Sequence, residues 1–176
     1  RYVGWIADEG FNVFVFDYRG YGRSAGTPGR KGVYEDCVAA VRYLQQRDDV
    51  DPEKIIVIGQ GLGGANAIAV VGRENFDGIL GIVAEAPFAA SGEIVTDRLA
   101  AASGSPGKAA GSDAYSAAAV VDQLGVPLIV IHGTADRVVP YRHGKRLFDK
   151  AKEPKQIWTI KGGRHCDGMT IYHEKV

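Results

Sequence analysis

Three segments of this sequence carry residues whose types and spacing could do chemistry together. The first is the glycine-rich run IIVIGQGLGG, which spans residues 55–64. An apolar run that ends in Gly-x-Gly-x-x-Gly matches the phosphate-binding turn of dinucleotide enzymes. With serine in place of Gly61, the same run would be a nucleophile elbow, Gly-x-Ser-x-Gly, which presents a catalytic serine at a strand end. The two interpretations predict phosphate binding and acyl transfer, respectively.

The other two segments place an acid and a histidine after later apolar runs. Asp136 lies in HGTADRVVP, and His165 ends GGRH. A histidine can take a proton from a nucleophile and return it to the leaving group near pH 7, and an aspartate beside it can hold the ring in the useful tautomer. In one large class of hydrolases these groups follow the nucleophile in the order acid, then histidine. That order favours the interpretation of the glycine-rich run as a nucleophile elbow.

The dinucleotide interpretation has one further feature in its support. Glu85 follows the next apolar run and could bind a ribose hydroxyl. Glycine alone is weak evidence, however, because any tight strand-to-helix turn selects it, and a turn without chemistry fits the run equally well. A dinucleotide site also has no use for Asp136 and His165.

The elements that must position these residues follow from the hydrophobic pattern. Apolar runs predict strands, and helical spacing or small-residue runs predict helices between them. The expected strands are residues 11–16, 55–58, 79–84, 127–132 and 156–160. The expected helices are 1–9, 33–46, 63–71, 93–102, 116–124 and 142–152, with loops at 20–32 and 103–112. This alternation predicts an α/β fold with a mostly parallel central sheet and helices on both faces, and sites at the carboxyl ends of its strands.

Composition narrows the classes of partner. The chain has 176 residues, 45% hydrophobic and 24% charged, which suits one globular domain. Lysine plus arginine and aspartate plus glutamate both number 21, so charge gives no reason to expect a nucleic-acid partner. No apolar run approaches the ~20 residues of a transmembrane helix. We expect no cofactor. We also expect no metal site, because Cys37 and Cys166 lack metal-ligand spacing.

The two cysteines also bear on location. They are expected to be ordinary thiols, which suits the cytoplasm. The chain starts at Arg1 rather than methionine, so any export or lipoprotein signal would have been lost with the start. The sequence indicates neither an oligomeric state nor a particular substrate.

A fourth motif, DYRGYGRS at residues 17–24, follows the first expected strand. The four motifs in this order resemble the α/β-hydrolase superfamily, in particular its small bacterial esterase, lipase and peptidase-like members. The resemblance covers nearly the whole chain, to about Met169. It implies Gly61 as the nucleophile position, Asp136 as the acid, His165 as the base and the Leu62 backbone N–H as an oxyanion donor. It also implies the remaining elbow residues, which are Gly59, Gln60, Gly63 and Gly64.

The first departure from the family pattern is Gly61 itself, which has no side chain and cannot form an acyl-enzyme. Glycine adopts the strained backbone of an elbow without the usual steric cost. A natural pseudoenzyme, a site deliberately disabled by substitution, and a water activated by His165 remain open explanations. Cys166 as a substitute nucleophile would lie at the wrong strand end for the oxyanion donor.

The second departure concerns the strand that precedes residues 11–16 in the family. It ends in a His-Gly loop that supplies the other oxyanion donor, and this sequence has no such segment. In the family that strand lies in the sheet between the strands corresponding to residues 11–16 and 55–58. We therefore expect residues 1–176 to form a single α/β-hydrolase domain that lacks its N-terminal strands and C-terminal helix. Direct pairing of 11–16 with 55–58 would contradict this.

The expected function is that of a serine-hydrolase-type domain for small esters, thioesters or amides, with its nucleophile absent. A non-catalytic member that binds a ligand or a protein partner is the alternative, and a dinucleotide-binding domain is the third. Residues near the motifs receive structural roles. We expect His132 at a strand end, His143 on a helix surface and His173 at the chain end. We expect Tyr18 and Arg19 to brace their loop, and Glu85 to lie near the pocket mouth or to cap the segment that follows it.

Overall fold

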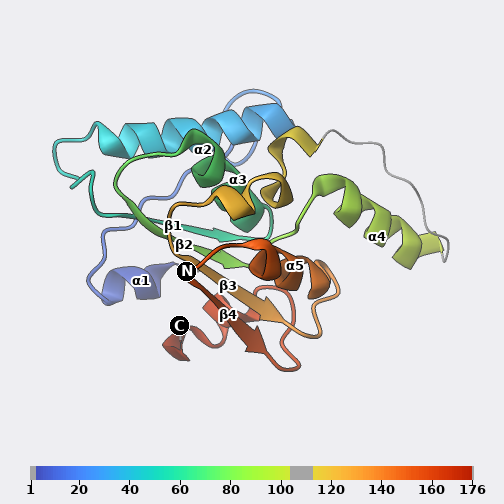
Figure 1. Ribbon diagram of the computed structural model, residues 1–176. Coiled ribbons are helices and arrows are strands. Elements are labelled where there is room, and N and C mark those ends of the chain that lie inside the picture. Colours follow the sequence, from blue (N-terminus) through green and yellow to red (C-terminus); the bar gives the residue numbers. More distant parts are fainter. Residues whose placement is uncertain (1–2, 104–112, 176) are drawn as a thin grey trace.

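A computed structural model of the chain describes residues 3–103 and 113–175. Its centre is a parallel sheet of four strands in the order β1 (Ile55–Gln60), β2 (Ile79–Glu85), β3 (Leu128–Gly133) and β4 (Lys155–Ile160) (Figure 1). All three pairings are parallel, so every strand ends at the same edge of the sheet. The predicted α/β class and parallel sheet are confirmed.

Helices cover both faces of the sheet. They are α1 (Gly4–Asp8), α2 (Arg30–Gln45), α3 (Leu62–Glu74), α4 (Ser91–Ser103), α5 (Arg142–Lys150) and α6 (Asp167–Thr170). Short 3₁₀ turns occupy Asp113–Tyr115, Ala117–Ala119, Val121–Gln123 and His173–Lys175. Helices α3 and α5 pack on one face, where α2 lies against α3, and α1 and α6 contact the other face.

The alternation of side chains along the strands divides the core between the two faces. On one face Ile82 packs with Ile68 of α3 and Leu147 of α5. On the other face Ile131 packs with Ile6 of α1 and Met169 of α6. The central strands β2 and β3 are largely buried on both faces and appear in the sequence as nearly continuous apolar runs. The edge strands β1 and β4 are partly exposed, but their apolar residues also allowed them to be located from the sequence.

Ile68→Ala should lower the free energy of unfolding by about 2–5 kcal/mol, because Ile68 is fully buried and its loss leaves a cavity in the core. The matched control is Ile56→Ala on β1, whose side chain is 45% exposed and should cost under about 1 kcal/mol. Urea unfolding of both variants measures the difference. Equal losses would contradict the burial of Ile68 and the exposure of Ile56.

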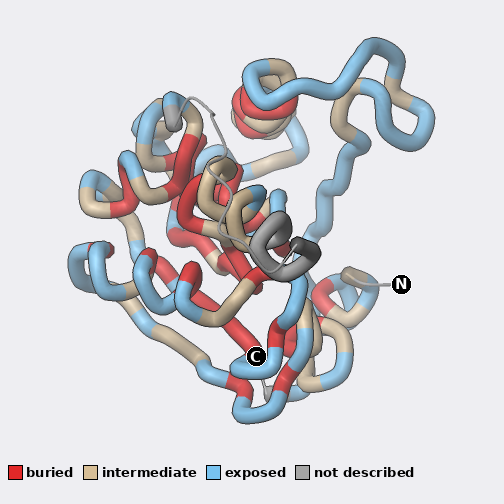
Figure 2. Tube along the Cα trace, turned by 90° about the vertical axis from the view of Figure 1, so that its right-hand side faces the viewer, coloured by how far each residue is buried: buried red, intermediate tan, exposed pale blue. Residues whose placement is uncertain are grey.

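The prediction of a strand at residues 11–16 is wrong for the residues described. This segment runs extended, has no strand partner among the described residues, and is exposed along its length, with Phe11 56% and Val15 67% exposed (Figure 2). An apolar run becomes a strand only where a neighbour supplies the ladder hydrogen bonds. Among the described strands β1 is an edge strand, and it does not pair with this segment. A further strand between the two therefore stays a prediction.

The prediction of a helix at residues 116–124 is also wrong, since two 3₁₀ turns take its place. The Ser116 hydroxyl accepts a hydrogen bond from the Ala119 N–H, and Val120 leaves the helical region at φ −131°. Val120 also lies against α3 at Gly72, where an added Cβ would be 3.0 Å from its side chain. Tertiary packing therefore overrides the local helical pattern. The predicted loop at 103–112 lies, except for Ser103, outside the described residues.

Candidate active site

The glycine run forms a sharp turn between β1 and α3. Gly61 has φ 53° and ψ −113°, a conformation that residues with side chains rarely adopt. The neighbouring glycines permit close packing of the turn, because a Cβ at Gly59 would lie 2.3 Å from the carbonyl carbon of Gly63. The turn therefore has the strained geometry of an elbow, with residue 61 at its apex.

The loops after β3 and β4 are locked together and carry the acid and the histidine. The Ala135 N–H donates to the Gly163 carbonyl at 2.9 Å. An added Cβ at Gly133 would lie 2.2 Å from that same oxygen, so the two loops approach as closely as glycine allows. Across this junction His165 Nδ1 lies 2.8 Å from Asp136 Oδ2. The carboxylate can only accept, so the ring donates through Nδ1 and leaves Nε2 free to act as a base.

The Asp136 side chain is fully buried and well supplied with donors. Its Oδ1 accepts the N–H groups of Val138 and Val139 at 2.8 and 2.9 Å. Burial alone would raise the pKa of Asp136, but the interactions with His132 and His165 and the two backbone N–H groups outweigh burial and hold that pKa well below its ordinary value. Asp136 is therefore charged at neutral pH.

The depressed pKa predicts how stability depends on pH. A carboxyl whose pKa is lower in the folded state stabilises the fold above its unfolded pKa, near 3.9, and loses that contribution as pH falls through the folded value. We expect Asp136 to contribute on the order of 2 kcal/mol at pH 7, lost progressively below about pH 5. Urea unfolding at several pH values, with Asp136→Asn as the reference that lacks this titration, measures it. Parallel pH profiles for the two proteins would contradict the prediction.

The structure brings His165 to the apex of the elbow. A Cβ built on Gly61 would lie 3.3 Å from His165 Nε2 and 3.6 Å from Cε1. The ring therefore presents one nitrogen to Asp136 and the other to residue 61. Leu62 is the first residue of α3, where backbone N–H groups have no partner within the helix. The positions predicted for nucleophile, acid, base and one oxyanion donor thus meet at one edge of the sheet.

Cys166, next to the histidine, is not a competing nucleophile in this geometry. Burial first, and then the charges of Glu85, Asp136 and Asp167, raise the pKa of its thiol to about 12. The thiolate is the reactive form, so at neutral pH this cysteine is a poor nucleophile. Its φ of 58° places it at the tight turn between His165 and α6.

The DYRGYGRS loop is braced by Arg19, as expected from the sequence. The Arg19 backbone N–H and guanidinium both donate to the Asp36 carboxylate of α2, at 2.7 to 2.9 Å. Tyr18 reaches toward the elbow helix, since its hydroxyl would lie 3.6 Å from a Cβ on Gly63. Burial raises the pKa of Tyr18, with Cys37 nearby adding to the shift. Both residues support the loop beside the site.

The three remaining histidines differ in how well the sequence located them. His143 is buried, not on the helix surface, because its Nδ1 accepts the Ala89 N–H at 3.3 Å and its Nε2 donates to Asp97 at 2.6 Å. His132 is fully buried at the end of β3 and donates through Nε2 to the Val139 carbonyl at 2.9 Å. His173 lies near the chain end as expected, with its ring 5.5 Å from that of Trp5.

Glu85 is also buried, which the sequence did not indicate. It accepts hydrogen bonds from Gln60, Gly168 and Met169. Its carboxylate is thus occupied within the protein and is not free to bind a ribose hydroxyl. The only signal in the sequence was the position of an acidic residue at a strand end.

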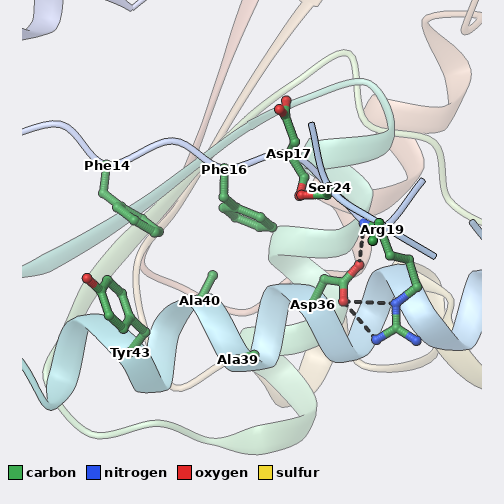
Figure 3. A pocket seen from close by; sticks show the side chains of 10 residues that line it. Phe14, Phe16, Asp17, Arg19, Ser24, Asp36, Ala39, Ala40 and Tyr43 are labelled. Carbon is green, nitrogen blue, oxygen red and sulfur yellow. Dashed lines mark hydrogen bonds and ion pairs between the residues drawn. The ribbon is translucent and has the colours of Figure 1, made fainter. Parts of the chain in front are cut away.

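A groove of about 450 Å³ lies away from these residues, between the segment that follows α1 and helix α2 (Figure 3). Figure 3 shows Phe14 and Phe16 turned toward α2, which carries Tyr43, and the Arg19–Asp36 pair joins the two walls at one end. Gly61, Asp136 and His165 are not among the residues that line it. The groove therefore belongs to the exposed 11–16 segment rather than to the candidate site.

The chain is similar in sequence to several known proteins. The chain is 36% identical to the uncharacterized protein YfhR of Escherichia coli K12 over 176 residues, which cover 99% of this chain and 60% of YfhR. It is 28% identical to human alpha/beta hydrolase domain-containing protein 17B over 166 residues, 94% of this chain and 54% of that protein. The chain therefore spans little more than half the length of these relatives.

A solved structure shows the same fold. The Pyrococcus furiosus esterase Pf2001 superposes with a TM-score of 0.77 at 20% identity, over 98% of this chain and 69% of that chain. Among the described residues, no helix is both long and apolar enough to cross a membrane. The sequence profile of the prolyl oligopeptidase family (Peptidase_S9) matches residues 2–170. The chain belongs to the prolyl oligopeptidase family, within the α/β-hydrolase superfamily.

Proposed function

We propose that this chain is a serine-hydrolase-type domain for small esters, thioesters or amides, in which Gly61 occupies the position of the nucleophile. The observation that carries the proposal is the placement of His165. Its Nδ1 lies 2.8 Å from Asp136, while its Nε2 lies 3.3 Å from the point where a residue-61 Cβ would be. A hydroxyl on that Cβ would be within hydrogen-bonding reach of a base already oriented by an acid.

With serine at position 61, each group has a role in acyl transfer. His165 Nε2 would take the hydroxyl proton as the oxygen attacks the acyl carbon, and would then deliver that proton to the leaving group. Asp136 would stabilise the charged ring without taking its proton. The Leu62 N–H at the start of α3 would stabilise the oxyanion. In the second half of the cycle, water would release the acyl group by the same proton route.

With glycine at position 61, the covalent route is closed, which supports the alternative of a pseudo-hydrolase that binds a ligand or a protein partner. The specific observation in its favour is the backbone of Gly61, whose φ of 53° suits glycine. Glycine here keeps the turn and removes the chemistry. Under this alternative, Asp136 and His165 remain as polar groups beside a bound ester or amide.

A fluorophosphonate probe distinguishes the two functions. The probe phosphonylates an activated serine, so we expect it to label Gly61→Ser and to leave the glycine protein unlabelled. The control Gly61→Ser/His165→Ala retains the hydroxyl and loses the base, so the probe should label it more slowly than Gly61→Ser. Absence of labelling in folded Gly61→Ser would contradict the hydrolase proposal and favour the binding role.

The dinucleotide function has little support, because the Glu85 carboxylate is buried and bonded within the protein. Titration with NADH, followed by its fluorescence, should show no saturable binding at millimolar concentration. Saturable binding of NADH would instead favour the dinucleotide-binding function.

A further inference from the structure

We propose that Glu85 is a positioning residue, a buried carboxylate that fixes the distance between the base His165 and residue 61. It touches neither a substrate nor the reacting atoms. It acts by holding together the two loops that carry those atoms. The inference rests on the proposed hydrolase function, although its structural part can be tested without any activity.

The first argument is the position of Glu85 in the sheet. It is the last residue of β2, in register with Gln60 of β1 on one side and Ile131 of β3 on the other. Its backbone carbonyl accepts the Gly61 N–H at 2.8 Å. Glu85 is therefore attached directly to the apex of the elbow, and its strand neighbours β3, after which the acid follows, while the histidine follows β4, two strands away.

The second argument is the set of donors that surround its side chain. Oε2 accepts a hydrogen bond from Gln60 Nε2 at 2.7 Å, and Oε1 accepts the N–H groups of Gly168 and Met169 at 2.6 and 3.1 Å. Gln60 immediately precedes residue 61, and Gly168 is the third residue after His165. A single carboxylate thus joins the nucleophile position to the histidine loop, across 83 residues of sequence in the case of Gly168.

The third argument is the closeness of this junction. An added Cβ at Gly168 would lie 2.7 Å from Glu85 Oε1 and 2.6 Å from an Ile131 methyl carbon, so the backbone reaches the carboxylate only because residue 168 is glycine. A buried carboxylate is costly unless donors surround it, and Glu85 is 2% exposed with three of them. Charge-assisted hydrogen bonds of this kind are about twice as strong as neutral ones.

The consequence is that His165 is held at two points. Its ring is oriented by Asp136, while the turn that follows it, through Cys166 in the left-handed conformation, is attached to Glu85. If the second attachment is lost, the loop can move as a unit and Nε2 moves away from residue 61. A displacement of about 1 Å at reacting atoms can cost roughly 100-fold in rate.

The test uses Glu85→Gln, which keeps the shape and one acceptor oxygen, and Glu85→Ala, which removes both acceptors. Each is made in the present chain and in Gly61→Ser. The matched control is Glu74→Gln at the end of α3, another carboxylate with two donors, Tyr34 and Arg42, remote from the site. Readouts are kcat and KM for a p-nitrophenyl ester, the NMR resonance of the proton between His165 Nδ1 and Asp136, and amide hydrogen exchange at Gly168 and Met169.

In Gly61→Ser we expect Glu85→Ala to lower kcat about 100-fold with KM changed less than about threefold, and Glu85→Gln to have an intermediate effect. In either background the Nδ1 proton resonance should broaden or shift, and exchange at Gly168 and Met169 should accelerate at least about tenfold. Glu74→Gln should leave all of these unchanged.

Unchanged kcat, Nδ1 resonance and exchange in folded Glu85→Gln would overturn the proposal, as would a loss of thermal stability with the Nδ1 resonance intact. If Glu85→Ala fails to fold, Glu85→Gln decides. If Gly61→Ser proves inactive, the hydrolase function fails. The resonance and exchange measurements on the present chain then still decide whether Glu85 holds the histidine loop.

Discussion

Gly61→Ser is expected to hydrolyse a p-nitrophenyl ester about 10³-fold faster than the protein with glycine. Loss of the serine from a complete site costs about 10⁶-fold in a well-studied serine protease, and loss of one oxyanion donor costs about 10²–10³-fold. Among the described residues, only the Leu62 N–H is proposed as an oxyanion donor. Dividing the ~10⁶-fold effect of the serine by the ~10²–10³-fold effect of one oxyanion donor leaves an expected gain of about 10³-fold when serine is restored.

The backbone at residue 61 also sets a cost for this substitution. At φ 53° and ψ −113° a side chain is strained, and strain of this kind costs about 1–3 kcal/mol. The new Cβ would lie 3.3 Å from His165 Nε2, so the ring, whose side chain is 28% exposed, must yield by a few tenths of an ångström. Gly61→Ala is the matched control, because it has the same Cβ and no hydroxyl. Equal ester hydrolysis by the alanine and serine variants would rule out nucleophilic catalysis at residue 61.

Asp136→Asn, made in Gly61→Ser, should return ester hydrolysis to within about tenfold of the glycine protein. The analogous change in a serine protease costs about 10⁴-fold, because the amide presents a donor to Nδ1 and stabilises the wrong tautomer of the histidine. Here the ring must donate to residue 136 at 2.8 Å for Nε2 to act as a base. An asparagine amide in that place would leave Nε2 protonated and unable to accept the serine proton.

The same variant is expected to fold, which makes the loss of rate interpretable. The asparagine carbonyl can still accept the N–H groups of Val138 and Val139. The change from charged to neutral acceptor should lower the free energy of unfolding by about 1–3 kcal/mol. Stopped assays at pH 7 with circular dichroism on the same samples provide the measurement. A folded variant that retains more than a tenth of the Gly61→Ser rate would contradict the role assigned to Asp136.

Four strands could be located from the sequence within two residues of their observed ends. The central strands β2 and β3 are largely buried on both faces, which leaves a nearly continuous apolar run, and the partly exposed edge strands β1 and β4 carry enough apolar residues to be recognised as well. The segment 11–16 has the same local signal and yet is not a strand among the described residues. The difference is the presence of a hydrogen-bonding neighbour, which no local pattern records.

The candidate site, like the fold, could be predicted from the sequence only in part. The order of Gly61, Asp136 and His165 could be read because each follows an apolar run, and parallel strands bring their carboxyl ends to one edge. The misplaced His143 shows the limit. Its position at the start of a helix suggested a surface residue, but Asp97 and the Ala89 N–H, 46 and 54 residues away, provide it with buried partners.

By itself the sequence determined the α/β fold, the strand ends at which polar residues meet, and the lack of a side chain at residue 61. Each of these depends on local properties, namely burial along a run, backbone freedom in a turn and the chemistry of one side chain. Only the tertiary structure decided that His165 Nε2 points at residue 61 and that Glu85 joins the elbow to the histidine loop. Both depend on hydrogen bonds between residues far apart in sequence, whose distances are fixed only when the strands are assembled side by side.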